Sequence, residues 1–387
     1  MIRYYTAGES HGKCVTVVLE GIPAGVAVDE KYINHHLARR QKGYGRGKRM
    51  EIETDKVEIL SGIRWGETMG SPILLLVENK DWENWADIMS ASAKDKDEKF
   101  IQRQPRPGHA DLAGMLKYDR KDMRDILERA SARETAAKVA AGAVAKKFLE
   151  EFKIHVVSFT KQIGKIRAQA LNMDPRDVPG VTEQSPLRCI DKFAEKKMVA
   201  EIKNAAKNGD TIGGIFTVAV QGVPSGLGTH AQWDLKLDGR VAQALMAIQA
   251  IKGVEIGRGF DVVNFRGSEV HDEIMYDRSK KEFYRKSNNA GGIEGGMSNG
   301  EILIFRAAMK PISSLRNPLK TVDLDSKKSV DSAIVRSDVC AVPAAGVVGE
   351  AVIAIEIARA MKEKFGGDSL KEMKRNYKNY IKQILNY

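Results

Sequence analysis

Two short segments each place a histidine among glycine and charged residues, a combination suited to proton transfer. The first is Gly8-Glu9-Ser10-His11-Gly12 and the second is Arg106-Pro107-Gly108-His109-Ala110-Asp111. Histidine gains and loses a proton near neutral pH, and glycine lets the backbone approach a ligand closely. The two segments therefore predict a site that handles protons, with His11 and His109 as its candidate acid–base groups.

The arginines indicate what kind of ligand that site holds. They collect beside glycine and proline, at 39–49 and 103–106 and at Arg129 and Arg133, within a chain of net charge +11. Guanidinium groups make planar, bidentate contacts with carboxylate and phosphate. A generally basic surface or nucleic-acid binding would also explain the charge. However, aromatic residues make up only 6% of the chain, and no stacking platform for single strands is evident. We favour a pocket for a small anion.

Asp338 and Arg336 form a third candidate group, in a segment that precedes a run of small residues at 343–346. A simpler interpretation is that Asp338 caps a helix and pairs with Arg336. Likewise, His109 could be a loop histidine that is bonded to Asp111. The residues alone leave both alternatives open.

Several classes of protein are excluded. The segment from Gly8 to Lys13 is one residue short of a phosphate-binding P-loop and is followed by Cys14, and no dinucleotide-binding glycine motif is present. No residue grouping has metal-ligand spacing, and no apolar run is long enough to span a membrane. Three dispersed cysteines and the absence of a signal peptide predict a cytoplasmic protein. His35 and His36, on a polar helix, are expected at the surface.

Elements of both kinds must position these groups. Alternation of apolar and polar residues predicts strands at 14–20, 50–53, 57–62, 73–78, 155–159, 215–221, 254–265 and 301–307. Helical periodicity predicts helices at 29–41, 123–152, 191–208, 238–252, 344–365 and 370–385. Strands and helices do not alternate strictly, so we expect an α+β layered fold with antiparallel sheets.

The chain also resembles a duplication. The segment 21–25 (GIPAG) recurs at 222–226 (GVPSG), and the glycine pattern of 62–70 recurs at 292–300. Each copy adjoins an apolar strand, and the order of the matched segments is preserved. We therefore expect a single domain, 1–387, built from two pseudo-repeats of about 1–205 and 206–387. A site between the halves would draw loops from each.

Longer motifs carry a resemblance to a known family. The segments 8–12 with 21–25, 128–135 and 336–350 resemble the three signatures of the chorismate synthase family. Further matches lie at 41–47, 105–111, 209–214 and 291–300. The resemblance runs from residue 2 almost to the end of the chain, and several long motifs in the right order make it specific.

The resemblance implies a lyase that uses reduced FMN. Members convert 5-enolpyruvylshikimate 3-phosphate to chorismate by anti-1,4-elimination of phosphate, the last common step toward the aromatic amino acids, with no net redox change. It further implies a β-α-β sandwich, a homotetramer, and reduced flavin supplied by an external reductase or reductant. Neither nucleic acid nor membrane is an expected partner. A substrate with two carboxylates and a phosphate, beside the phosphate of FMN, also accounts for the many cations.

The same resemblance assigns roles to individual residues. His11 is similar to the proton donor to the departing phosphate, His109 to the histidine beside the flavin, and Asp338 to the carboxylate that helps remove the ring proton. The implied substrate contacts are Ser10, Arg40, Arg46, Arg49, Arg106, Arg133 and Arg336. The implied flavin contacts are Ser131, Ala132, Arg133, Gln249, Ala250, Gly295, Lys310, Pro311, Ile312, Ser313, Ser314 and Arg336. Gln249 replaces a common Asn and Ser314 a common Thr, and each keeps a hydrogen-bonding group.

Overall fold

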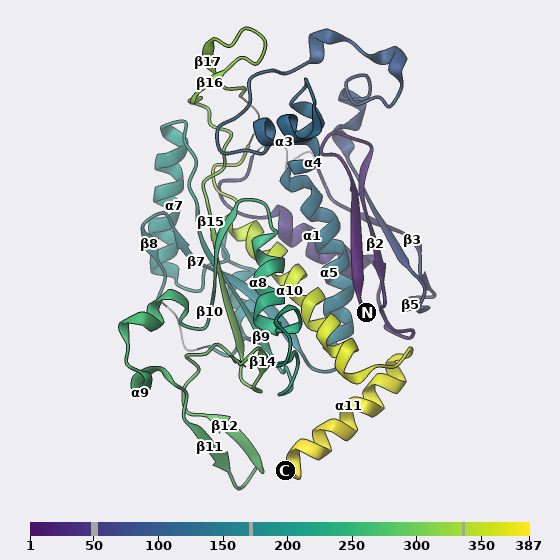
Figure 1. Cartoon of the computed structure of the whole chain (residues 1–387), viewed down its shortest axis with the longest axis vertical. Coiled ribbons are helices and arrows are strands. Elements are labelled where there is room, and N and C mark those ends of the chain that lie inside the picture. Colours follow the sequence, from purple (N-terminus) through teal and green to yellow (C-terminus); the bar gives the residue numbers. More distant parts are fainter. Residues whose placement is uncertain (48–52, 170–172, 335–336) are drawn as a thin grey trace.

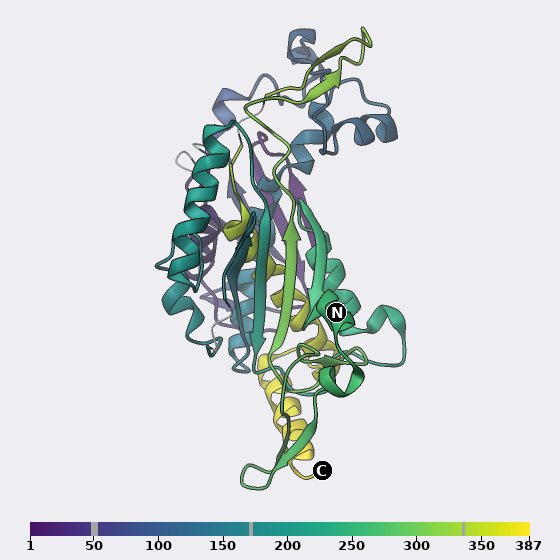
Figure 2. The same ribbon diagram turned by 90° about the vertical axis from the view of Figure 1, so that its left-hand side faces the viewer.

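A computed structural model describes residues 1–47, 53–169, 173–334 and 337–387. Its core is a sandwich in which two antiparallel sheets enclose a layer of helices (Figures 1 and 2). The first sheet has the order β1 (Arg3–Gly8), β2 (Cys14–Glu20), β6 (Ile73–Glu78), β3 (Val57–Ser61). The second has the order β10 (Ile251–Ile256), β15 (Leu303–Met309), β9 (Gly214–Gln221), β7 (His155–Ile163), β8 (Ile166–Arg167). Antiparallel sheets and mixed α+β content agree with the sequence prediction.

The alternation of side chains explains why the first sheet packs on one face. Val15, Val17 and Leu19 of β2 are buried, whereas Val18 points to the other face and is exposed. Val17 pairs with Leu75 of β6, which is also buried. Successive residues of a strand point to opposite faces, so these positions form one apolar surface against the helices.

The helix layer consists of α1 (Glu30–Gln41), α5 (Thr135–Glu150), α8 (Leu237–Met246) and α10 (Val342–Phe365). Helices α5 and α10 pack most closely, because α5 is rich in alanine and glycine. A Cβ atom added to Gly142 would lie 2.3 Å from Cβ of Ala351 in α10. Glycine at this position therefore sets the separation of the two helices.

The remaining elements lie at the ends and outside of the sandwich. Its upper end in Figure 1 carries α3 (Asp111–Tyr118), α4 (Arg124–Ala130) and the hairpin β16 (Lys320–Val322)–β17 (Ser329–Asp331). Helix α7 (Lys192–Lys207) flanks the second sheet, and α11 (Leu370–Leu385) projects from the lower end. The short elements are β4 (Ile63–Arg64), β5 (Glu67–Thr68), α6 (Val178–Thr182), α9 (Gly267–Val270), β11 (Ile274–Asp277), β12 (Glu282–Arg285), β13 (Ile293–Glu294) and β14 (Met297–Ser298).

The two sheets share detailed features. The order β1-β2-β6-β3 corresponds to β7-β9-β15-β10. Thr68 donates a side-chain hydrogen bond to the Pro23 carbonyl over 2.6 Å, and Ser298 donates one to the Pro224 carbonyl over 2.6 Å. Gly62 and Gly292 have φ angles of +82° and +80°. The matched positions are those that the sequence repeat aligns.

Three predicted elements differ from the structure. The helix expected at 123–152 is two helices, α4 and α5, because Ser131 has extended backbone (φ −62°, ψ 145°) and its side chain accepts from Arg133 N. The strand expected at 254–265 ends at Ile256 and is followed by a 3₁₀ turn at Gly259–Asn264. The helix expected at 238–252 ends at Met246, so that Ile251 begins β10. The strand expected at 50–53 lies mostly outside the described residues.

One polar cluster lies inside the sandwich. Glu350 of α10 is 1% exposed and forms ion pairs with Arg39 of α1 (2.8 Å), Lys146 of α5 (2.7 Å) and Arg188 (3.3 Å). It also accepts from Ser158 Oγ of β7 over 2.7 Å. The three cations hold the pKa of the Glu350 carboxyl well below its usual range, although burial alone would raise it. This one carboxylate therefore joins elements from both halves of the chain.

Candidate active site

The loop between β1 and β2 holds His11 against a buried carboxylate. Nδ1 of His11 lies 2.9 Å and 3.0 Å from the two carboxylate oxygens of Glu128 in α4. The backbone N–H of His11 donates to the same carboxylate over 2.9 Å, and that of Ser10 donates to the Glu128 carbonyl over 3.0 Å. The ring stacks on Trp85, with 4.0 Å between ring centroids. Burial raises the pKa of Glu128, but the bonds and charges of His11 and Arg124 outweigh this effect and lower it.

The start of α5 brings the predicted flavin and substrate positions beside this loop. Ser131 Oγ donates to Ser10 Oγ over 3.1 Å, and Ala132 begins the single 3₁₀ turn (Ala132–Glu134) that leads into α5. Arg133 Nε donates to Asn79 Oδ1 over 2.6 Å, and Asn79 Nδ2 donates to the Gly12 carbonyl over 2.6 Å. Asn79 therefore connects the arginine to the His11 loop.

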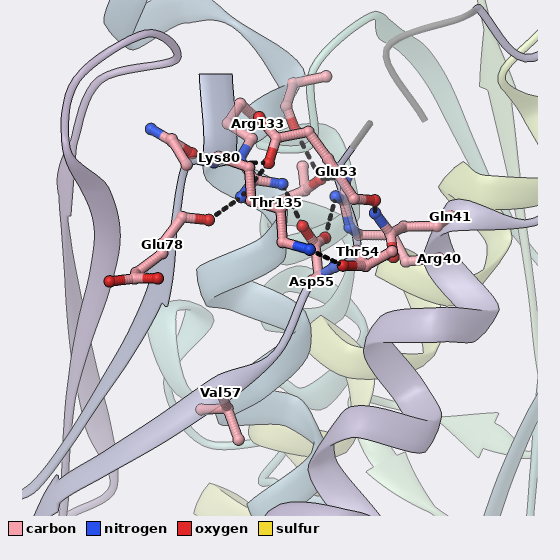
Figure 3. Close-up of polar contacts among 12 residues, drawn as sticks. Arg40, Gln41, Glu53, Thr54, Asp55, Val57, Glu78, Lys80, Arg133 and Thr135 are labelled. Carbon is pink, nitrogen blue, oxygen red and sulfur yellow. Dashed lines mark hydrogen bonds and ion pairs between the residues drawn. The ribbon is translucent and has the colours of Figure 1, made fainter. Parts of the chain in front are cut away.

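Two of the predicted substrate arginines share one carboxylate (Figure 3). Arg133 Nη1 and Arg40 Nη2 bind the two oxygens of Asp55 at 2.5 Å and 2.6 Å. The side chain of Asp55 is fully buried, and those of both arginines are nearly so. Burial raises the pKa of the Asp55 carboxyl, but the two guanidinium groups lower it more. Glu53, a second buried carboxylate, lies 3.8 Å from Arg133 Nη2. Two cations thus face two anions, and both guanidinium groups are fixed in place before any ligand binds.

His109 also faces a buried carboxylate. Its Nδ1 lies 2.5 Å from Oδ1 of Asp111, which is 0% exposed. Arg106 Nε donates to the other oxygen of Asp111 over 2.8 Å, and its Nη1 donates to Ser314 Oγ over 2.9 Å. Burial raises the pKa of Asp111, whereas hydrogen bonds from His109 and Arg106 lower it more. The contact between His109 and Asp111 is the one that the simpler interpretation proposed, and it also holds the ring in one orientation.

Asp338 lies between this group and the segment that follows α1. Its Oδ2 pairs with Arg46 Nη1 at 2.7 Å, and its Oδ1 accepts from Gly47 N over 2.6 Å. Ser337 Oγ donates to the Ser314 carbonyl over 2.7 Å, which joins Asp338 to the Arg106 group. Asp338 is not the residue at the N-cap of α10, which is Ala341. The helix-capping interpretation of Asp338 is therefore wrong.

The predicted flavin positions before β10 and after β15 connect the two histidine groups. Gln249 Nε2 donates to Glu134 Oε2 over 2.9 Å, and the Ala250 carbonyl accepts from Lys310 N over 2.9 Å. Lys310 Nζ in turn donates to the Gly108 carbonyl. Pro311, Ile312 and Ser313 fill the segment from Lys310 to Ser314, where the Ile312 carbonyl accepts from Thr211 Oγ1 over 2.7 Å. Hydrogen bonds and short stretches of chain thus link Ser10 through Glu134 and Lys310 to Asp338.

Three predicted positions are not part of this group as described. Gly295 lies in the turn between β13 and β14, before the Leu303 end of β15, whereas Lys310 follows its Met309 end. The seven residues of β15 separate those ends by about 20 Å. Arg49 and Arg336 lie outside the described residues.

Sequence reasoning missed the partners that orient the histidines. Glu128 lies in the motif at 128–135, but no local signal marks it, Trp85 or Asp55 as a partner of these groups. His36 was expected at the surface, but it is 7% exposed, packs on Tyr32 and has a pKa lowered to about 2, chiefly by burial. Its sequence signal is its position beside Leu37 and Ile33, which face the core.

Metal-binding clusters and membrane-spanning helices are both absent from the described ranges. No group of three or more histidine, cysteine or acidic side chains there is placed to hold a metal ion. No helix in those ranges combines the length and the apolar character needed to cross a bilayer.

Known proteins are similar to this chain over nearly its whole length. The model of the chorismate synthase family matches residues 2–361. A chorismate synthase of Geobacter sulfurreducens is 54% identical over 99% of both chains, and one of Desulforamulus reducens is 56% identical over 99% of this chain and 100% of its own. A crystal structure of a chorismate synthase superposes with a TM-score of 0.80 at 42% identity, covering 100% of this chain and 99% of the other. By these three comparisons, the chain is a member of the chorismate synthase family.

Proposed function

We propose that this chain converts 5-enolpyruvylshikimate 3-phosphate to chorismate and phosphate, using reduced FMN. The observation that carries the proposal is the continuous group of contacts at one end of the sandwich. It joins two histidines, each oriented by a buried carboxylate, to Asp338 and to several arginines. Proton donors and acceptors beside fixed cations suit the elimination of phosphate from a dianionic or more highly charged ligand.

In this proposal each group has a defined task. His11 donates a proton to the departing phosphate, and Asp338 takes part in removal of the ring proton. Arg40, Arg46, Arg106 and Arg133 bind the carboxylates and phosphate of the substrate, together with Ser10, Arg49 and Arg336. The carboxylate partners keep these cations in place, so that little reorganisation is needed as negative charge develops.

The residues also fit a flavin. Gln249 Oε1 is buried and has no hydrogen-bond partner among the described residues, and a buried acceptor of this kind calls for a ligand donor such as a flavin ring N–H. His109 would lie at the ring edge, with Ser131, Ala132, Ala250 and Lys310–Ser314 around it. Held by these residues, reduced FMN would supply the electron density that cleavage of the substrate C–O bond calls for, with no net redox change. An external reductase or reductant would have to supply FMN in this form.

The position of Gly295 bears on the assembly. Within one chain it is distant from Lys310, so its proposed flavin contact requires a second copy of the chain. A homotetramer would meet this requirement. Native mass spectrometry tests the oligomeric state, and a monomer that binds FMN fully would remove Gly295 from the site. We also propose a cytoplasmic location, which the three free cysteines favour.

The decisive experiment is an anaerobic assay. The purified chain is mixed with 5-enolpyruvylshikimate 3-phosphate and dithionite-reduced FMN, and both phosphate and chorismate are measured. Equal amounts of the two products are expected, with none when FMN stays oxidised. Absence of both products with reduced FMN bound would refute the proposal. Binding of RNA with a steep salt dependence, without flavin binding, would instead favour the nucleic-acid alternative.

A further inference from the structure

We propose that Glu128 is the positioning residue for His11 and that Trp85 is the surface against which the imidazole is held. The inference rests on the proposed role of His11 as a proton donor. It adds the groups that decide which ring nitrogen transfers the proton and in which direction that nitrogen points. Neither Glu128 nor Trp85 is placed in contact with substrate.

The contacts of Glu128 leave little freedom to the loop that carries His11. Its carboxylate receives the backbone N–H of His11 over 2.9 Å and lies 2.9 Å from Nδ1, while its own backbone carbonyl receives the N–H of Ser10. Its side chain is only 2% exposed. Since a carboxylate accepts hydrogen bonds, Nδ1 must carry the proton in this pair. The proton that is exchanged with a ligand is therefore the one on Nε2.

Trp85 restricts the remaining motion of the ring. The two rings are stacked at 29°, and the guanidinium of Arg124 lies over Trp85 at 4.9 Å from its centroid. Arg124 Nη1 also donates to Glu128 over 3.0 Å, and Trp85 Nε1 donates to Asp81 Oδ2 over 3.1 Å. Both the plane and the edge of the imidazole are thus fixed, by groups that are themselves held in place.

The charges around His11 determine in which direction removal of the Glu128 charge should shift the pH profile of His11. Glu128 favours the protonated ring at a distance of 2.9 Å. Arg124, on the same helix, disfavours the protonated ring. It is bonded to Glu128 and not to His11. Asp81 is bonded to Trp85, which separates it from the imidazole. Glu9 and Lys13 of the loop itself carry opposite charges. Glu128 is the nearest of these charges, so its removal should change the ring's charge balance more than removal of any of the others, since Coulomb interaction falls with distance.

The experiment measures His11 without requiring activity. Diethylpyrocarbonate modifies neutral imidazole, and trypsin releases His11 as the only histidine of the peptide 4–13. Its rate of modification is followed by mass spectrometry between pH 5 and 9 in the flavin-free chain. We expect E128Q, which keeps the size of the side chain but removes its charge, to move the midpoint of this profile to lower pH by about 1 unit or more.

Two further variants separate the roles. Asp125 is an exposed carboxylate of the same helix, paired with Arg120, and D125N should leave the midpoint unchanged. W85L should raise the plateau rate of His11 modification several-fold, because the ring is released from the stack. Far-ultraviolet circular dichroism checks that each variant is folded. A midpoint in folded E128Q equal to that of D125N would overturn the charge role, and an unchanged plateau in W85L would overturn the stacking role.

The outcome is separable from that of the proposed function. If the wild-type chain forms no chorismate but E128Q shifts the His11 profile, the positioning contact stands and the lyase proposal fails. If the wild type is active and no shift is seen, only the positioning inference fails. In active enzyme, E128Q should also move the basic limb of the kcat profile to lower pH by the same amount. A structural defect would lower kcat at every pH instead.

Discussion

Replacement of Gly142 by alanine tests the close packing of α5 on α10. The added Cβ would lie 2.3 Å from Cβ, 2.4 Å from Cα and 2.8 Å from the carbonyl oxygen of Ala351. Carbon atoms in contact prefer about 3.5–4.0 Å, so the helices would have to separate by roughly 1.5 Å. Two of the three obstructing atoms belong to the backbone, and a side-chain rotation cannot relieve the overlap.

The expected cost follows from two opposing contributions. Overpacking of a core costs about 1–3 kcal/mol, and a backbone obstruction places this site at the upper end. Alanine is favoured over glycine in a helix by about 1 kcal/mol. The free energy of unfolding of G142A should therefore fall by about 2 kcal/mol.

Urea unfolding of wild type and variant at equal protein concentration measures this change. Gly180 in α6 provides a matched control, because nothing lies within 4 Å of its added Cβ. G180A should be neutral or stabilising by up to about 1 kcal/mol. A G142A protein as stable as G180A would show that α5 and α10 do not approach as closely as described.

Four further predictions concern charge and catalysis. Burial lowers the pKa of His36 to about 2, so this histidine takes up a proton in the unfolded chain, but not in the folded one, as pH falls below about 6.5. The free energy of unfolding therefore decreases in this range. In H36Q this decrease should be smaller by about 1–2 kcal/mol between pH 7 and 5, as measured by urea titrations. H109A should lower kcat by about 10²- to 10⁴-fold in the anaerobic assay, and an unchanged rate would remove the residue from the mechanism. R46A should mainly raise KM, and a wild-type saturation curve would count against its substrate contact. D55N removes the carboxylate that two buried arginines share, although Arg133 keeps Glu53 at 3.8 Å. It should destabilise by about 3–5 kcal/mol, measured as the urea midpoint, and wild-type stability would show that Glu53 is enough to neutralise them.

Helix caps and hydrophobic periodicity predicted the secondary-structure elements well where both indicated the same bounds. Helix α11 was expected at 370–385 and has those bounds, because Ser369 caps its start and its side chains are strongly amphipathic. The strand expected to continue to 265 stops because Gly257 and Gly259 adopt left-handed φ angles of +58° and +60°, which end the pleat. The break at Ser131 was missed since helical periodicity continues across it.

The candidate site was predictable in its residue types but not in its partners. Histidine within glycine-rich loops indicated proton chemistry. The carboxylate that orients His11, however, lies 117 residues away, at Glu128, and nothing local connects the two. Only the fold brings α4 against the β1–β2 loop. Asp111, two residues from its histidine, was within reach of sequence reasoning because its distance along the chain is short.

The Glu350 cluster has a consequence for how this chain can diverge. Glu350 faces cations from three separate segments, and two of these cations also pair with Glu183. Loss of the Glu350 carboxylate would therefore leave an excess of positive charge in the interior. Substitutions at these positions should therefore occur together, or pass through a less stable ancestor. Among descendants, a neutral residue at 350 should be found only together with altered residues at 39, 146 or 188.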